Sequence, residues 1–106
     1  MLEAQQRELL RRLTLNDEQA LRDVMTGRTP GSDALLDDKN RALVKLAALV
    51  ALDSETASLQ VGVDVAHAAG AADEEIIETV LVIAPIVGTT RISSANPRLA
   101  AVLRRE

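Results

Sequence analysis

The only histidine of the sequence lies three residues after an aspartate, a spacing that could support proton transfer. Side chains three positions apart lie on the same face of a helix, so Asp64 could hold the imidazole of His67 as a general base. Together with Gln60, the same residues could equally form a solvated polar stripe. We favour the stripe, because Leu59 and Gly62 fall on a different side of the expected helix.

A second polar cluster follows Gly88 and contains one arginine among hydroxyl side chains: Thr89, Thr90, Arg91, Ser93 and Ser94. A guanidinium beside hydroxyl groups can hold a carboxylate or a phosphate through paired hydrogen bonds. A solvated connector between two helices would have the same composition, and we favour that interpretation. Arg91 is therefore a candidate ligand-binding residue in a segment expected to be a turn.

Four residue types are absent from the 106-residue chain: Cys, Phe, Trp and Tyr. Without thiols there is no disulfide, no redox-active cysteine and no thiolate metal ligand. A lone histidine would leave zinc or non-haem iron with carboxylate ligands, which these metals rarely accept alone. Base stacking needs aromatic side chains, and a net charge of −4 disfavours nucleic acid. We expect no cofactor, no metal and no nucleic-acid partner.

Composition and length predict one globular domain over residues 1–106, because 47% of the residues are hydrophobic and 26% are charged. The longest apolar runs, residues 42–52 and 76–88, are shorter than the roughly 20 residues that cross a bilayer. Residues 1–4 are too polar to begin a signal peptide. We therefore expect a soluble, cytoplasmic protein that does not enter a membrane.

Start and stop signals predict two short N-terminal helices. The first covers residues 2–13, and a capping box of Asn16 and Gln19 begins the second, which ends near Met25. The Gly- and Pro-rich residues 27–32 are the predicted loop.

Longer helices are predicted in the rest of the chain. Asp37 should cap a helix that ends near Leu52. Ser54 should cap the next helix, which ends at Gly70. The acidic residues 73–75 favour another helix start.

Two later prolines and one valine-rich stretch affect these helix predictions. Pro85 should kink the helix in which it lies, and Asn96 with Pro97 should open a final helix to about Arg104. Residues 61–65 alternate valine as strands do, but the signals on either side favour a helix.

The helices over residues 42–52 and 76–87 are apolar almost all round, which predicts burial on every side. A domain of this size buries only about 60–70% of its unfolded surface. Neighbouring subunits should therefore cover part of these helices. We expect a homo-oligomer, a trimer or a hexamer in preference to other states.

Three segments of residues 36–103 carry a family resemblance: DKNRALV at residues 38–44, AHAAGAADEEI at 66–76, and Val87-Gly88. In this order they resemble the carboxymuconolactone decarboxylase-like family, which includes the alkyl hydroperoxidase D-type proteins. Together with the helix signals, the resemblance leads us to expect a small all-α bundle of five or six helices with a central antiparallel pair. The apolar helices would mediate the oligomerisation inferred above.

The departures from the family pattern concern its thiol chemistry. Thiol-active relatives carry a glutamate where this chain has Ala42, and two cysteines that align with Glu55 and Ser58. A histidine normally occupies the position of Gly62, in the decarboxylase branch as well. A thiol relay needs a thiolate, a partner sulfur and a base, all of which are missing here. No catalytic residue can be carried over from the resemblance.

Glu55, Ser58, Gly62 and Arg91 remain the candidate pocket positions. Glu55 could be a buried acid–base residue, or a first-turn carboxylate that stabilises the helix dipole. Gly62 begins a small-residue ridge with Ala66 and Gly70 that suits close helix packing. We expect a family protein that binds, or acts without a cofactor on, a small carboxylate or lactone-like molecule. Two versions stay open: an enzyme of the decarboxylase or isomerase kind, and a non-catalytic assembly or binding subunit. A thiol peroxidase is disfavoured by the missing cysteines.

Overall fold

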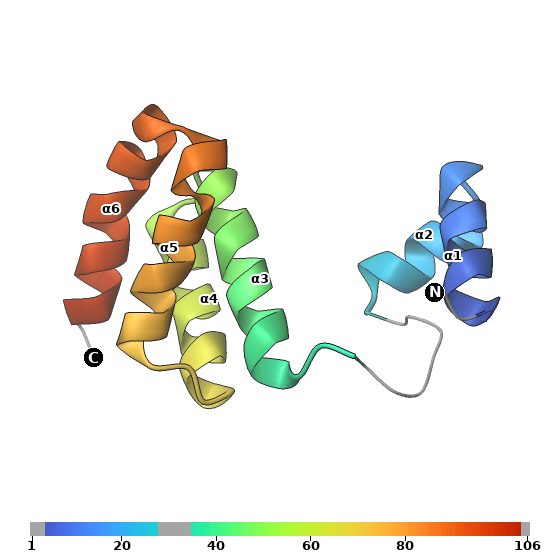
Figure 1. Cartoon of the computed structure of the whole chain (residues 1–106), viewed down its shortest axis with the longest axis horizontal. Coiled ribbons are helices and arrows are strands. Elements are labelled where there is room, and N and C mark those ends of the chain that lie inside the picture. Colours follow the sequence, from blue (N-terminus) through green and yellow to red (C-terminus); the bar gives the residue numbers. More distant parts are fainter. Residues whose placement is uncertain (1–3, 28–34, 105–106) are drawn as a thin grey trace. The chain divides into compact units, whose positions relative to one another are not determined.

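The computed structural model describes residues 4–27 and 35–104, which form six helices and no strand (Figure 1). The all-α prediction is confirmed. The chain divides into two compact units, Met1–Leu35 and Leu36–Glu106; that the whole chain is a single domain stays a prediction. The helices are α1 (Ala4–Thr14), α2 (Glu18–Met25), α3 (Asp38–Ala51), α4 (Thr56–Ala68), α5 (Asp73–Val87) and α6 (Thr89–Arg104).

In the N-terminal unit, α1 and α2 pack against each other and meet at a capping aspartate. The Asp17 carboxylate accepts hydrogen bonds from the Ala20 backbone N–H at 2.9 Å and from the Arg12 guanidinium at 3.0 Å. The prediction that Asn16 is the cap is wrong by one residue. Asn16 instead has a φ of 58°, a left-handed conformation that asparagine tolerates between helices. The predicted loop lies outside the described residues except for Gly27.

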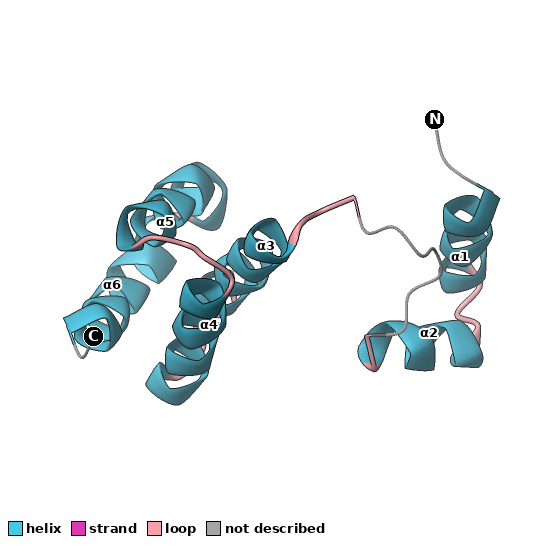
Figure 2. Ribbon diagram, turned by 90° about the horizontal axis from the view of Figure 1, so that it is seen from below, coloured by secondary structure: helices cyan, strands magenta, loops and turns pink. Residues whose placement is uncertain are grey.

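The C-terminal unit is an antiparallel four-helix bundle, which confirms the predicted small bundle. The helices α3 and α5 run in one direction and α4 and α6 in the other (Figure 1), and Figure 2 shows them from one end. Each of the four helices contacts the other three. Aliphatic side chains fill the space between them, and the largest fully buried ones are Leu46, Val50, Leu59, Val63, Ile76 and Val102.

Local capping signals account for most helix ends in the bundle. Asp37 is the N-cap of α3 as predicted, and its carboxylate accepts a hydrogen bond from the Asn40 N–H at 2.8 Å. Gly70 follows α4 with a φ of 95°, the left-handed conformation that favours glycine. The prediction for Ser54 is wrong, because Glu55 occupies the N-cap position of α4 and makes no side-chain capping bond.

The alternating valines at residues 61–65 lie inside α4, which confirms the helical interpretation. Pro85 lies inside α5. Gly88, with a φ of 96°, separates α5 from α6. Among the described residues, no helix has the length and apolar character needed to cross a membrane.

The last helix begins earlier than predicted. Residues 89–94, expected to form a connector, are the first turns of α6, and Pro97 lies in its interior instead of at its start. The N-cap prediction for Asn96 is therefore wrong. Ala95 is buried in the bundle, and Arg91 bonds to the end of α3. We infer that these contacts offset the backbone hydrogen bond that Pro97 removes.

Candidate functional site

The two positions that align with the family cysteines lie on the surface. Glu55 and Ser58 occupy the start of α4, and both are exposed. None of the polar or charged residues that the structure describes is buried. Glu55 is thus not a desolvated carboxyl group of the kind that general acid–base catalysis commonly uses.

Gly62 lies in the middle of α4 and is buried against α3. A Cβ atom added to Gly62 would lie 2.8 Å from Leu49 Cδ1 and 3.1 Å from Leu46 Cδ1. Ala66, one turn further along, is also buried. Gly70 does not extend this ridge as expected, because it is exposed and faces open space. Of the three residues, Gly62 and Ala66 are buried, and Gly62 is the one that meets side chains of α3 closely.

A pocket of about 390 Å³ lies beside Gly62, between α3 and α4. It brings Gly62 together with Ala42, the two positions where relatives carry a histidine and a glutamate. Glu55, Ser58 and Arg91 do not line it. Lys45 is its only titratable lining residue among the described ones, and the complete lining is Ala42, Lys45, Ala48, Leu49, Val61, Gly62 and Val65.

A second pocket, of about 300 Å³, continues the first along the same helix pair. The two pockets share Ala42, Lys45 and Val65, and the second adds Asp38, Arg41, Ala68 and Ala69. We call the two together the α3–α4 groove. Arg41 and Lys45 were not among the candidate residues, although the sequence offered a signal: they are four positions apart, and they are the only polar residues between Arg41 and Ala51.

Arg91, the candidate ligand-binding residue, forms a contact within the bundle. Its Nη1 donates a hydrogen bond to the Ala51 carbonyl oxygen at 3.0 Å, at the end of α3. One turn later, Ser94 Oγ lies 2.9 Å from Asp53 Oδ1. The polar cluster after Gly88 thus connects α6 to the turn between α3 and α4.

The polar stripe on α4 forms contacts along its length. Gln60 Nε2 donates to Asp64 Oδ1 at 2.9 Å, and His67 Nε2 lies 2.7 Å from Asp73 Oδ1 at the start of α5. Asp64 is exposed and His67 is half-buried. The described residues contain no group of three or more His, Cys, Asp or Glu placed to hold a metal ion.

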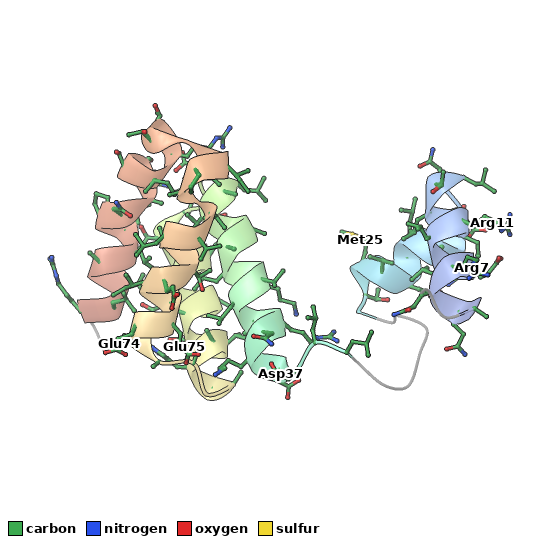
Figure 3. The ribbon with its side chains drawn as sticks, viewed as in Figure 1. Arg7, Arg11, Met25, Asp37, Glu74 and Glu75 are labelled. Atoms are coloured by element: carbon green, nitrogen blue, oxygen red, sulfur yellow. The ribbon has the colours of Figure 1, made fainter. Side chains whose placement is uncertain are left out.

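Figure 3 labels Glu74 and Glu75 at the start of α5, at the same end of the bundle as Asp37 at the start of α3. Glu75 Oε1 accepts from the Ala72 backbone N–H at 3.0 Å, and Glu75 Oε2 lies 2.9 Å from Lys39 Nζ. The backbone bond and the Lys39 ammonium hold the pKa of Glu75 below its usual value. The same contact raises the pKa of Lys39.

The model of the carboxymuconolactone decarboxylase family matches residues 18–101. The chain belongs to this family. The match begins in α2, earlier than the resemblance over residues 36–103, and ends within α6. Neither the curated proteins nor the solved structures give a match to the chain. This carboxymuconolactone decarboxylase family member has a small aliphatic pocket at Ala42 and Gly62, and its Glu55 and Ser58 lie at the surface.

Proposed function

We propose that this member of the carboxymuconolactone decarboxylase family is a non-catalytic subunit that assembles with copies of itself. The side of Gly62 where a histidine side chain would project is occupied by Leu46 and Leu49. A pocket lined by aliphatic residues and one lysine supplies no acid–base pair. The chain contains no cysteine, so it cannot carry out the thiol chemistry of its relatives.

The alternative is a cofactor-free decarboxylase or isomerase that acts on a small carboxylate or lactone-like molecule. Such an enzyme needs a positioned group that removes or delivers a proton. Lys45 is exposed, and it is the only titratable residue that lines the pocket beside Gly62 in the described part of the chain. Glu55 does not line that pocket. The geometry therefore favours the subunit over the enzyme.

The observation that carries the proposal is the apolar surface of α5. Leu81, Val82 and Ile86 expose 65%, 66% and 88% of their surface to solvent. Contiguous exposed apolar side chains commonly mark protein–protein contacts. A stable interface buries about 800 Å² on each partner, more than three side chains supply, so other exposed residues such as Val44 would contribute.

Size-exclusion chromatography with light scattering tests the proposal at micromolar concentration. We expect a closed oligomer, a trimer or a hexamer. Leu81→Glu and Ile86→Glu should dissociate it, because an unpaired charge would be buried at the interface. Ala101→Glu, which places the same charge at an exposed position on α6, is the matched control. A well-folded monomer of the unchanged protein would refute the proposal.

A further inference from the structure

Two cations of the α3–α4 groove have no acidic partner within the described part of the chain. Arg41 and Lys45 form no ion pair and no side-chain hydrogen bond with any residue in the described ranges, although the chain has a net charge of −4. Other cations of the same bundle are paired: Lys39 with Glu75, and Arg98 with Asp53. Unpaired cations beside an apolar pocket suit an anionic ligand that also has an apolar part.

We propose that the α3–α4 groove binds an unbranched aliphatic monocarboxylate, held by Arg41 and Lys45. Residues four apart lie on one helix face, so both cationic groups can approach the same carboxylate. A guanidinium can donate two parallel hydrogen bonds to a carboxylate. The hydrocarbon chain would extend from Lys45 toward Leu49 and Gly62, in the part of the groove without polar side chains.

The lining of the groove selects this class of ligand over other anions. Beyond Lys45 the wall is aliphatic: Ala48, Leu49, Val61, Gly62 and Val65. Sugars and lactones would leave polar groups there without hydrogen-bond partners, which is costly in an apolar environment. Asp38 lines the same pocket as Arg41 and Lys45, so one acidic and two basic side chains leave that end of the groove a single net positive charge, which suits one carboxylate better than two. The volume of about 390 Å³ lies within the range of small-molecule sites.

Titration calorimetry of the full chain with hexanoate and octanoate tests the inference. Two additional methylene groups should lower the Kd roughly 15-fold, from the burial free energy of a methylene group. Octanol has the hydrocarbon chain without the charge, and acetate has the charge without the long hydrocarbon chain. Both should bind much more weakly than octanoate. Lys45→Gln and Arg41→Gln should each raise the Kd for octanoate roughly tenfold, as the loss of a charge-assisted hydrogen bond does.

Two further variants separate specific binding from general effects. Ala48→Leu fills the pocket from an exposed position on α3 and should abolish octanoate binding without loss of fold. Arg104→Gln removes an exposed arginine that lines neither pocket of the groove and should leave the Kd unchanged. Circular dichroism of each variant checks that it is folded.

Three outcomes would overturn the inference. Octanol that binds as tightly as octanoate would make the groove a general apolar surface. Acetate that binds as tightly would make it a simple anion site. Absence of octanoate binding in the assembled protein would show that the groove takes no such ligand. Light scattering on the same samples measures assembly separately. A failure to bind octanoate would therefore contradict the ligand proposal without contradicting the proposed subunit function.

Discussion

Arg98 on α6 donates a hydrogen bond from Nη1 to the Ser54 carbonyl oxygen at 2.9 Å, across 44 positions of sequence. The same nitrogen lies 3.2 Å from the Asp53 carboxylate. Asp53 has a φ of 56°, a left-handed conformation that turns the chain between α3 and α4. The side chain of Arg98 thus contacts both Asp53 and Ser54 and connects the turn between α3 and α4 to α6.

Removal of this guanidinium should weaken the bundle. Arg98→Met keeps most of the aliphatic stem but loses the bonds to Ser54 and Asp53. Hydrogen bonds of this kind contribute about 1–2 kcal/mol, so we expect the free energy of unfolding to fall by about that amount. Urea denaturation measures the change. Arg104→Met, at an exposed position of the same helix, should change the free energy by less than about 0.5 kcal/mol; equal losses in both variants would contradict the role of Arg98.

A large side chain at Gly62 should destabilise the contact between α3 and α4. Because even a Cβ atom there would lie 2.8 Å from Leu49 Cδ1, Gly62→Leu must displace Leu49 and Leu46. Overpacking of this kind costs about 1–3 kcal/mol, which a thermal or urea unfolding curve would show. Ala57→Leu, at an exposed position of α4, is the control. An unchanged midpoint for Gly62→Leu would mean that the two helices separate easily.

The contacts of Glu75 predict a loss of stability in acid. The pKa of Glu75 is lowered in the folded protein by the Ala72 N–H and by Lys39. Its stabilising contribution is therefore present above the ordinary glutamate pKa of about 4.3 and is lost as the pH falls through the lowered value. Glu75→Gln should reduce stability at neutral pH and flatten the decline in acid.

Urea denaturation at a series of pH values would measure this effect. Glu74→Gln changes an exposed carboxylate in the same turn and serves as the control. If both variants show the same dependence on pH as the unchanged protein, the contacts of Glu75 do not couple its protonation to folding.

Peroxide reduction with a dithiol donor should not exceed the rate without protein. The family's thiol relay requires cysteines, and this chain has none. A coupled spectrophotometric assay on purified protein measures the rate. Turnover that persists through purification and follows the protein peak would show a mechanism unrelated to thiolates.

The sequence by itself determined the elements whose causes are local. The helix starts at Asp37 and at residues 73–75, and the end at Gly70, depend on groups within about one turn, so short motifs predicted them. The family also followed from short motifs. The error of one residue at Asn16 arose because asparagine suits both a cap and a left-handed turn.

Only the tertiary structure decided which candidate positions meet. Gly62 and Ala42 line one pocket, whereas Glu55 and Ser58, on the same helix as Gly62, face solvent. Arg91 bonds to a carbonyl oxygen 40 positions away. Pro97 signals a helix start by local rules, yet α6 runs through it, and Ala95 two residues earlier is buried in the bundle. Contacts between residues far apart in the chain form only when whole helices pack, and neighbouring residue types do not encode that packing.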